Sequence, residues 1–282
     1  HGRNSFSWAA GGGWEDFCRL LMRWPEVNPS ARDRCGRTAF SWAAANGFYE
    51  TCQLLIQSYP NILSEDCDDR KRTPLWWAAK NGHTEVVRIL LGAQKGLPAD
   101  QLGLDLDSKD NDGETAFTSA ARDNHGDVMR FLIQTRRKDS DVPSSLREWA
   151  SRYLHQAARM DWAGLAKILI EEISNIVETE DVSCRTQDLI GDTLTPLCVA
   201  AEMGSIRVMR VLLKAGAAVN FTTSKAKDTP LLLALRNREE EVAAALIESG
   251  ADTQHKNTLR EDTRALATRG KLDLDPYSFG PE

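Results

Sequence analysis

One stretch decides the fold: RTPLWWAAKNGHTEVVRILL, residues 72–91. Thr73 can cap a helix through its hydroxyl, and Pro74 suits the first helical position because its missing amide proton costs nothing there. Leu75 and the alanine pair after the tryptophans fall at positions i, i+3 and i+4, which form one buried helical face. The stretch therefore predicts a short first helix, a turn at Gly82 and a second amphipathic helix after it.

The alanine pair of this stretch returns along the chain at a nearly fixed period. The pairs begin at Ala9, Ala43, Ala78, Ala120, Ala157 and Ala200, and a degenerate seventh begins at Ala234. Their separations of 34, 35, 42, 37, 43 and 34 residues are typical of a stacked repeat rather than of a single closed core. We therefore predict an all-α solenoid of about seven helix-turn-helix repeats.

Some repeats depart from this pattern at the turn between their two helices. Asn124 replaces the glycine in the fourth repeat, and it can also adopt a left-handed turn. Asp161 and Arg238 stand at the same position in repeats five and seven, and repeat five lacks the Thr-Pro start. We expect these two repeats to be distorted.

Two stretches are longer than the period requires. Residues 92–112 and 171–192 are polar and acidic, and we expect them to be surface excursions. A helix-capable stretch at 259–268 could cover the last apolar face, and residues 271–282 predict an extended or disordered tail. We assign residues 1–270 to the repeat array.

Composition and charge exclude several classes of function. The net charge of −6 argues against a nucleic-acid partner. The apolar runs are far shorter than the roughly 20 residues that span a membrane, so we expect no membrane segment. The six cysteines form no Cys-x-x-Cys and have no histidine at metal-ligand spacing, which favours reduced thiols. We expect neither metal nor other cofactor.

The amino terminus has no basic stretch or apolar core of the kind that marks a secretory signal. We therefore expect an intracellular, cytoplasmic protein. His1-Gly2-Arg3 lines up with Cys35-Gly36-Arg37, so the sequence opens inside a repeat, and we expect it to be a piece of a longer protein.

The quoted stretch resembles the ankyrin repeat, whose signatures Thr-Pro-Leu-His-x-Ala-Ala and Gly-His-x-x-Val-Val-x-x-Leu-Leu match residues 73–79 and 82–91. Trp76 stands where the family usually has histidine. The family's hairpin tip, Asp-x-x-Gly-x-Thr, is matched at 33–38 and 110–115. The Ser-Trp-Ala-Ala wording of the first two repeats is also similar to ankyrin arrays of fungal multidomain proteins, including NLR-like signalling receptors. The resemblance implies a scaffold that binds proteins.

In the ankyrin family, partners dock on a concave side formed by the hairpin tips and the exposed positions of each first helix. Carried over residue by residue, the resemblance implies a set of partner-binding residues: Arg34, Arg37, Arg70, Lys71, Trp76, Lys80, Asn81, Asn111, Asp112, Arg122, Arg159 and Met160. Basic residues dominate this set, so an acidic peptide or protein face would suit it. The alternative is an ankyrin-fold enzyme or small-molecule sensor, with a pocket formed by the two excursions.

The tryptophans have a structural and a functional interpretation. Trp8, Trp42 and Trp77 share the position directly before the alanine pair, where we expect them to pack repeat against repeat. Trp14 starts a second helix and is also expected to pack. Trp76 is expected to be partly exposed, where it could serve a partner.

Catalysis would require a convergent set of groups. His83 and His125 follow the family's Gly-His wording, which places them at the start of a second helix for structural reasons. His155 lies near the family's usual histidine, which bonds neighbouring loops. No phosphate-binding loop, nucleophile elbow or His-Glu-x-x-His helix occurs in the sequence. We therefore predict that the chain is not an enzyme.

Overall fold

The computed structural model describes residues 2–59, 67–92, 105–139, 143–174, 186–187 and 193–270. Over these ranges the chain forms fifteen α-helices and one pair of two-residue strands. It divides into two compact units, His1–Asp139 and Ser140–Glu282, which we call unit 1 and unit 2. Residues 93–104 of the first predicted excursion, residues 175–185 and 188–192 of the second, and the predicted tail at 271–282 lie outside the described residues.

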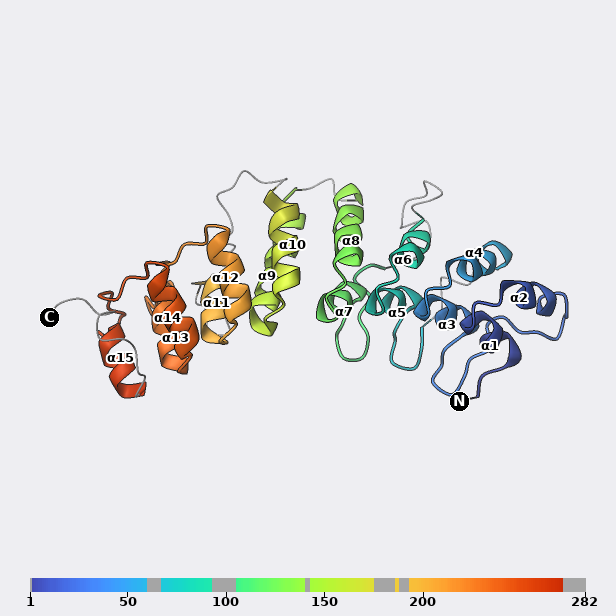
Figure 1. Ribbon diagram of the computed structural model, residues 1–282, viewed down its shortest axis with the longest axis horizontal. Coiled ribbons are helices and arrows are strands. Elements are labelled where there is room, and N and C mark those ends of the chain that lie inside the picture. Colours follow the sequence, from blue (N-terminus) through green and yellow to red (C-terminus); the bar gives the residue numbers. More distant parts are fainter. Residues whose placement is uncertain are drawn as a thin grey trace. The chain divides into compact units, whose positions relative to one another are not determined.

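Unit 1 holds four helical pairs. They are α1 (Ser5–Gly11) with α2 (Glu15–Leu21), α3 (Ala39–Ala45) with α4 (Tyr49–Ser58), α5 (Pro74–Lys80) with α6 (Thr84–Leu90), and α7 (Ala116–Arg122) with α8 (Gly126–Asp139). The first helices α1, α3, α5 and α7 pack in one row, and the second helices pack in another row beside it (Figure 1).

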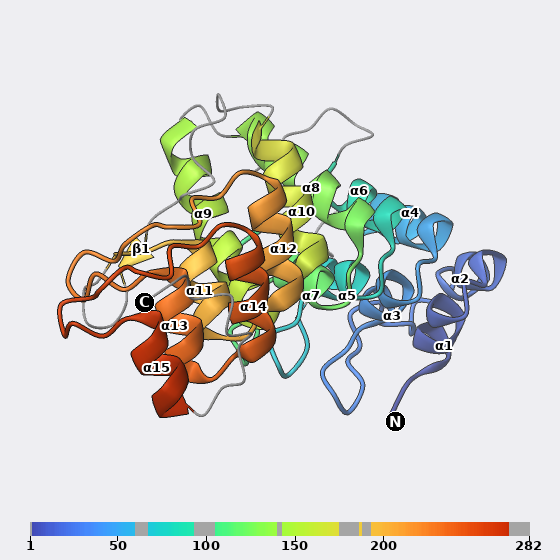
Figure 2. The same ribbon diagram turned by 60° about the vertical axis from the view of Figure 1, so that its left-hand side comes forward.

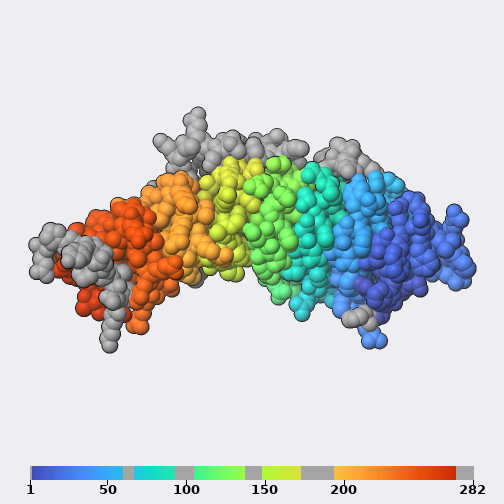
Figure 3. All heavy atoms as spheres, viewed as in Figure 1, coloured from blue at the N-terminus to red at the C-terminus, as the bar shows by residue number. Residues whose placement is uncertain are grey.

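Unit 2 repeats the plan with longer elements. It holds α9 (Pro143–Met160) with α10 (Ala163–Ser174), α11 (Pro196–Glu202) with α12 (Ile206–Lys214), α13 (Pro230–Asn237) with α14 (Glu240–Glu248), and α15 (Thr263–Gly270). The first helices follow one another as α9, α11, α13 and α15 (Figure 2). Before α11, β1 (Thr186–Gln187) pairs antiparallel with β2 (Thr193–Leu194). Within each unit the repeats lie side by side in sequence order (Figure 3).

The first helices begin as the sequence predicts, at a side-chain cap. The hydroxyls of Thr38, Thr73, Thr115, Thr195 and Thr229 each accept the backbone N–H three residues ahead. Asn4 does the same for α1 with its side-chain oxygen. This bond satisfies one of the four amides that a helix start leaves unpaired.

The turn from first to second helix keeps one geometry in all seven complete repeats. A residue with positive φ follows each first helix: Gly13, Gly47, Gly82, Asn124, Asp161, Gly204 and Arg238. The next amide then donates to the carbonyl of the first alanine of the pair, as from His83 N–H to Ala78 O at 2.9 Å. The expected distortion at this turn in repeats five and seven is therefore absent. Asp161 is held there because its carboxylate accepts the amide of Val208 at 3.0 Å and pairs with Arg207.

The alanine pairs form the core between first helices. Both members are buried in each of the six pairs, and Leu235 is buried beside Ala234 in the seventh. A methyl-sized side chain lets neighbouring helices approach closely, which explains why the pair recurs at the repeat period.

Two features of unit 2 depart from the expected pattern. α9 starts at Pro143, nine residues before the predicted repeat at Arg152, and buries Trp149 against Tyr153 with ring centroids 4.7 Å apart. The second feature is an additional first helix. Residues 257–262 form another hairpin tip, in which Arg260 is left-handed and Asp262 caps α15. The predicted covering helix at 259–268 is thus a half repeat.

Candidate functional site

The hairpin tips of unit 1 are held by one aspartate each. Asp33 accepts the amides of Cys35 and Arg37 at 2.8 and 3.0 Å, and Asp68 and Asp110 act in the same way in the next two hairpins. Neighbouring tips are joined by backbone hydrogen bonds, from Asp69 N–H to Cys35 O at 3.1 Å and from Asn111 N–H to Arg70 O at 2.9 Å. These bonds arrange the three tips in a row.

Behind the tips, arginines and tryptophans of repeats one to three alternate. We call this group the Arg–Trp stack; it consists of Arg3, Trp8, Arg37, Trp42, Arg72 and Trp77. The guanidinium of Arg37 lies 3.5 Å from the ring centroid of Trp42 in its own repeat and 4.0 Å from that of Trp77 in the next. Arg3 lies 3.0 Å from Trp42, and Arg72 lies 4.4 Å from Trp77. Each contact is within the range of cation–π attraction.

The same aspartates that shape the hairpins also hold the indoles. Trp42 donates its ring N–H to Asp33 at 3.0 Å, and Trp77 donates to Asp68 at 3.2 Å. Burial alone would raise the pKa of Asp33, but the amides of Cys35 and Arg37 and the Trp42 indole lower it below its usual value. The Asp33 carboxylate therefore stays charged beside the stacked cations.

Two predicted site residues are buried. Arg37 lies inside the Arg–Trp stack, and burial, with the nearby charge of Arg3, lowers its pKa to about 10. Trp76 is also buried, with Trp77 packed edge-on at 5.1 Å. The expectation that these two side chains lie at the surface is wrong. Arg37 lies between the indoles of Trp42 and Trp77, and Trp76 lies against Trp77.

The expectation of packed tryptophans is only partly met. Trp42 and Trp77 are half-buried between repeats, whereas Trp8 and Trp14 are exposed. The sequence already held the signal for the stack. Arginine and tryptophan stand five residues apart in each of the first three repeats.

The other predicted tip residues lie on the surface. Arg34 and Lys71 are exposed, and neither side chain has a hydrogen-bond or ion-pair partner among the residues that the structure describes. Arg70 and Asp112 form a loose exposed ion pair at 3.9 Å. The side-chain amide of Asn111 donates to the backbone carbonyl of Asp69 at 3.3 Å. The tips therefore present two cations that have no ion-pair partner within the described ranges.

The predicted first-helix residues of unit 1 mostly bond within the unit. Lys80 pairs with Asp123 of the next repeat at 3.2 Å, and Asn81 donates to the carbonyl of Ala45 at 2.6 Å. Arg122 pairs with Glu114, eight residues earlier in its own repeat. These side chains are exposed or half-buried, but Lys80 and Asn81 already join neighbouring repeats.

In unit 2 the predicted residues Arg159 and Met160 are both exposed at the end of α9. Met203 occupies the equivalent position beside α11, against which α9 packs, and it is also exposed. Met160 and Met203 each stand two residues after an alanine pair, a position that the resemblance places on the partner-facing side. Flexible thioethers suit a surface that adapts to apolar groups.

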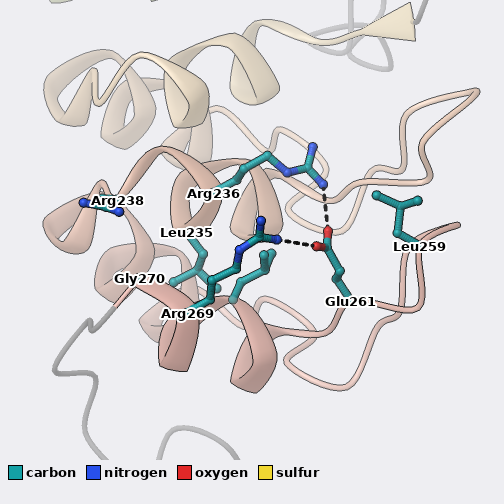
Figure 4. Close-up of a pocket in the computed structure, with 8 residues that line it drawn as sticks. Leu235, Arg236, Arg238, Leu259, Glu261, Arg269 and Gly270 are labelled. Atoms are coloured by element: carbon teal, nitrogen blue, oxygen red, sulfur yellow. Dashed lines mark hydrogen bonds and ion pairs between the residues drawn. The ribbon is translucent and has the colours of Figure 1, made fainter.

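Unit 2 also has a pocket of about 320 Å³ between α13 and α15. In Figure 4, Glu261 lies between Arg236 and Arg269, with which it pairs at 3.3 and 3.2 Å. Arg236 also pairs with the buried carboxylate of Asp228 at 2.6 Å, which raises its pKa despite partial burial. The charged groups of Arg236, Glu261 and Arg269 pair with one another, and these ion pairs connect α13 to α15 and to the hairpin before it.

The alternative of a histidine-lined pocket depends on different residues. His155 is buried, with its ring nitrogens 2.8 Å from Ser151 O and 3.3 Å from Leu194 O, and burial lowers its pKa. It therefore links α9 to the start of α11. Neither His155 nor His125 lines the pocket beside α15. Most of both excursions lies outside the described residues.

Across the described part of the chain, no three His, Cys, Asp or Glu side chains gather as a metal site would require. None of the helices within those ranges is both long enough and apolar enough to cross a bilayer.

The family model that matches this chain agrees with the repeat geometry. The family model described as "Ankyrin repeats (3 copies)" matches residues 6–100, 60–145 and 154–257. The "Ankyrin repeat and KH domain-containing protein mask-1" of Caenorhabditis elegans is 29% identical over 189 residues, which make up 61% of this chain and 7% of that protein. The solved ankyrin repeat domain of Bcl-3 is 18% identical, with a TM-score of 0.46 and 94% of each chain covered.

Proposed function

Because the chain belongs to the ankyrin-repeat family, we propose that it binds a protein partner through the hairpin tips of unit 1, and that this partner presents acidic groups. Ankyrin repeats are protein-interaction modules, so the class of function follows from the family. The choice of face and the chemistry of the partner are our own proposal.

The single observation that carries the proposal is the pair of unneutralised cations at the tips. Arg34 and Lys71 are exposed and unpaired among the described residues, and they project from adjacent hairpins that are bonded to one another. Exposed charges of one sign steer the encounter with a partner of opposite sign and fix its register. The Arg–Trp stack behind them supports the role, because it holds the hairpins in place before binding.

Unit 2 supports a second area of contact for the same function. Arg159 is exposed with no ion-pair partner in the described ranges, and Met160 and Met203 lie on successive first helices next to it. We assign apolar contact to the methionines and orientation of a carboxylate to Arg159.

The test compares two charge-reversed double variants of the whole chain. Proteins are first captured from the source cell on the wild-type chain, and their association rates are then measured at low and high salt. Arg34→Glu with Lys71→Glu should lower the association rate by on the order of tenfold at low salt, because steering is lost. Arg23→Glu with Lys214→Glu is the matched control, since both residues are exposed and lie at the C-terminal ends of second helices, Arg23 just after α2 and Lys214 as the last residue of α12.

The control variant should bind as wild type does, and the difference between the two doubles should shrink at high salt. Equal association rates for both doubles with every captured protein would show that the tips of unit 1 are not the binding face.

A further inference from the structure

The pocket between α13 and α15 has walls of two kinds, charged and apolar. Its volume is about 320 Å³, and its lining comes from the end of α13, from the hairpin at 257–262 and from α15 (Figure 4). This volume is at the lower end of the roughly 300 to 1,000 Å³ that ligand pockets occupy. The pocket is therefore large enough for a small organic molecule.

Arginines outnumber carboxylates at this pocket. The guanidinium of Arg236 is already engaged, because it bonds Asp228 at 2.6 and 3.0 Å and Glu261 at 3.3 Å. Glu261 is shared, since it also pairs with Arg269 at 3.2 Å. Arg238 adds a third guanidinium to the lining. Three positive charges against two negative ones leave one positive charge without a counterion in the described part of the chain.

The carboxylates that follow Arg238 most closely in the chain are directed elsewhere. The Glu239 carboxylate lies over Gly204 of the preceding repeat, so close that a methyl there would collide with it. Glu241 pairs with Arg210 at 3.5 Å. Neither carboxylate therefore neutralises Arg238.

Arg238 also has an unusual backbone conformation. Its φ is 65°, in the left-handed region, where four of the equivalent turns have glycine and the other two have Asn124 and Asp161. Glycine, and more rarely asparagine or aspartate, adopts this region routinely, whereas arginine is strained in it. Strained backbone of this kind is concentrated at binding and active sites. Here the strained residue is the one whose charge is left over at the pocket.

The apolar wall consists of three leucines. Leu235 and Leu266 line the pocket from α13 and α15 and are buried. Leu259, on the hairpin, is 72% exposed, the largest value for a big apolar side chain in the described ranges. An aliphatic group placed on Leu259 would remove this surface from water, which is favourable.

From this combination we propose that the pocket binds an aliphatic carboxylate. Arg238 and Arg269 take the head group, because planar guanidiniums match the two oxygens of a carboxylate. The alkyl chain lies on Leu259 and Leu266. One surplus positive charge matches one carboxylate, whereas a phosphorylated group carries about −1.5 to −2 charges at pH 7 and would exceed it.

The test is an NMR titration of the full chain, which follows the Nε–Hε signals of its arginines. The probe is 4-methylpentanoate, and 4-methylpentanamide is its uncharged match. The acid should shift the signals of Arg238 and Arg269 saturably, and the amide should not. Acetate should bind at least about tenfold more weakly than 4-methylpentanoate, because it buries less apolar area. Inorganic phosphate should also bind more weakly than the acid.

A second probe distinguishes two sources of the same chemistry. Acetyl-glycyl-leucine presents a carboxylate and an aliphatic side chain at the end of a peptide. Tighter binding of this peptide than of 4-methylpentanoate would support the site with a protein carboxyl terminus as its ligand. Weaker binding of the peptide would support the site with a free acid as its ligand.

Variants of the full chain separate the pocket from general attraction of anions. Arg238→Gln should weaken binding of 4-methylpentanoate by on the order of tenfold, because a charge-assisted contact is lost. Arg260→Gln is the matched control, since Arg260 is exposed and left-handed at φ 59° but does not line the pocket. It should leave the affinity unchanged. Leu259→Ser should reduce the preference for 4-methylpentanoate over acetate.

Absence of a saturable shift with 4-methylpentanoate would overturn the proposal. Equal weakening by Arg238→Gln and Arg260→Gln would overturn the site, because the acid would then respond only to surface charge. Tighter binding of phosphate than of the acid would overturn the ligand class. None of these results depends on the tips of unit 1, so the test is independent of the proposed partner-binding face.

Discussion

Replacing Arg37 by alanine tests whether the Arg–Trp stack stabilises unit 1. The guanidinium lies 3.5 and 4.0 Å from two indole centroids and is buried. A desolvated cation–π contact contributes about 1 to 2 kcal/mol, so two contacts contribute about 2 to 4 kcal/mol. The cost of burying the charge, seen in the lowered pKa of Arg37, opposes this gain. We expect Arg37→Ala to lower the free energy of unfolding by about 2 kcal/mol.

The measurement is equilibrium unfolding in urea, followed by circular dichroism and by tryptophan fluorescence. Arg34→Ala is the matched control in the same hairpin, and it should change the free energy of unfolding by less than ~0.5 kcal/mol because the side chain is exposed. Coupling is measured in a double-mutant cycle with Trp77→Leu. A coupling energy of about 1 to 2 kcal/mol is expected if the Arg37–Trp77 contact contributes as a desolvated cation–π pair.

The reasoning is refuted if Arg37→Ala costs no more than Arg34→Ala, or if the cycle with Trp77 shows no coupling. A third readout separates the stack from surface electrostatics. Raising the salt concentration should leave the cost of Arg37→Ala unchanged, because buried charges are screened much less than exposed ones.

Three further predictions concern pH, glycine and thiols. Burial lowers the pKa of His155, so the unfolded chain, with a pKa near 6.5, binds its proton first as pH falls. Stability should therefore hold above pH ~6.5 and decrease below it, and His155→Gln should flatten the urea midpoints measured between pH ~7.5 and ~5.5. Gly47→Ala should destabilise more than Gly113→Ala by at least ~1 kcal/mol in thermal or urea unfolding, since both have φ near 80° but only the methyl at 47 meets the next repeat's imidazole. Equal costs would contradict this account. Cys35 is exposed and should react with a thiol reagent in the native chain, whereas Cys18, whose pKa burial raises to about 11, should react only on unfolding.

Much of the fold could be predicted because most repeats carry the same signals for a helix start and for a buried helical face. The threonine caps at 73, 195 and 229 and the buried alanine pairs lie where the quoted stretch predicts them. The early start of α9 at Pro143 could not be predicted, since repeat five carries no Thr-Pro signal that marks where its first helix begins. Trp149 and Tyr153 lie one helical turn apart in α9, and their rings pack on each other within the helix.

The candidate site was less predictable, because exposure was inferred from repeat position alone. In the hairpin tip at 33–38, Arg34 is exposed as expected, but Arg37 is buried against Trp77, which belongs to the following repeat. A rule applied one repeat at a time cannot see a contact formed between two. The constant spacing from arginine to tryptophan was the signal that would have revealed it.

The alternation of Arg3, Arg37 and Arg72 with the indoles has a consequence for how unit 1 comes apart. The guanidiniums of Arg3 and Arg37 are each anchored in one repeat and shield a ring that belongs to the repeat after it. When one repeat melts, its neighbour's indole is therefore laid bare to water at the same moment. We therefore expect the first three repeats to unfold together, as one cooperative unit.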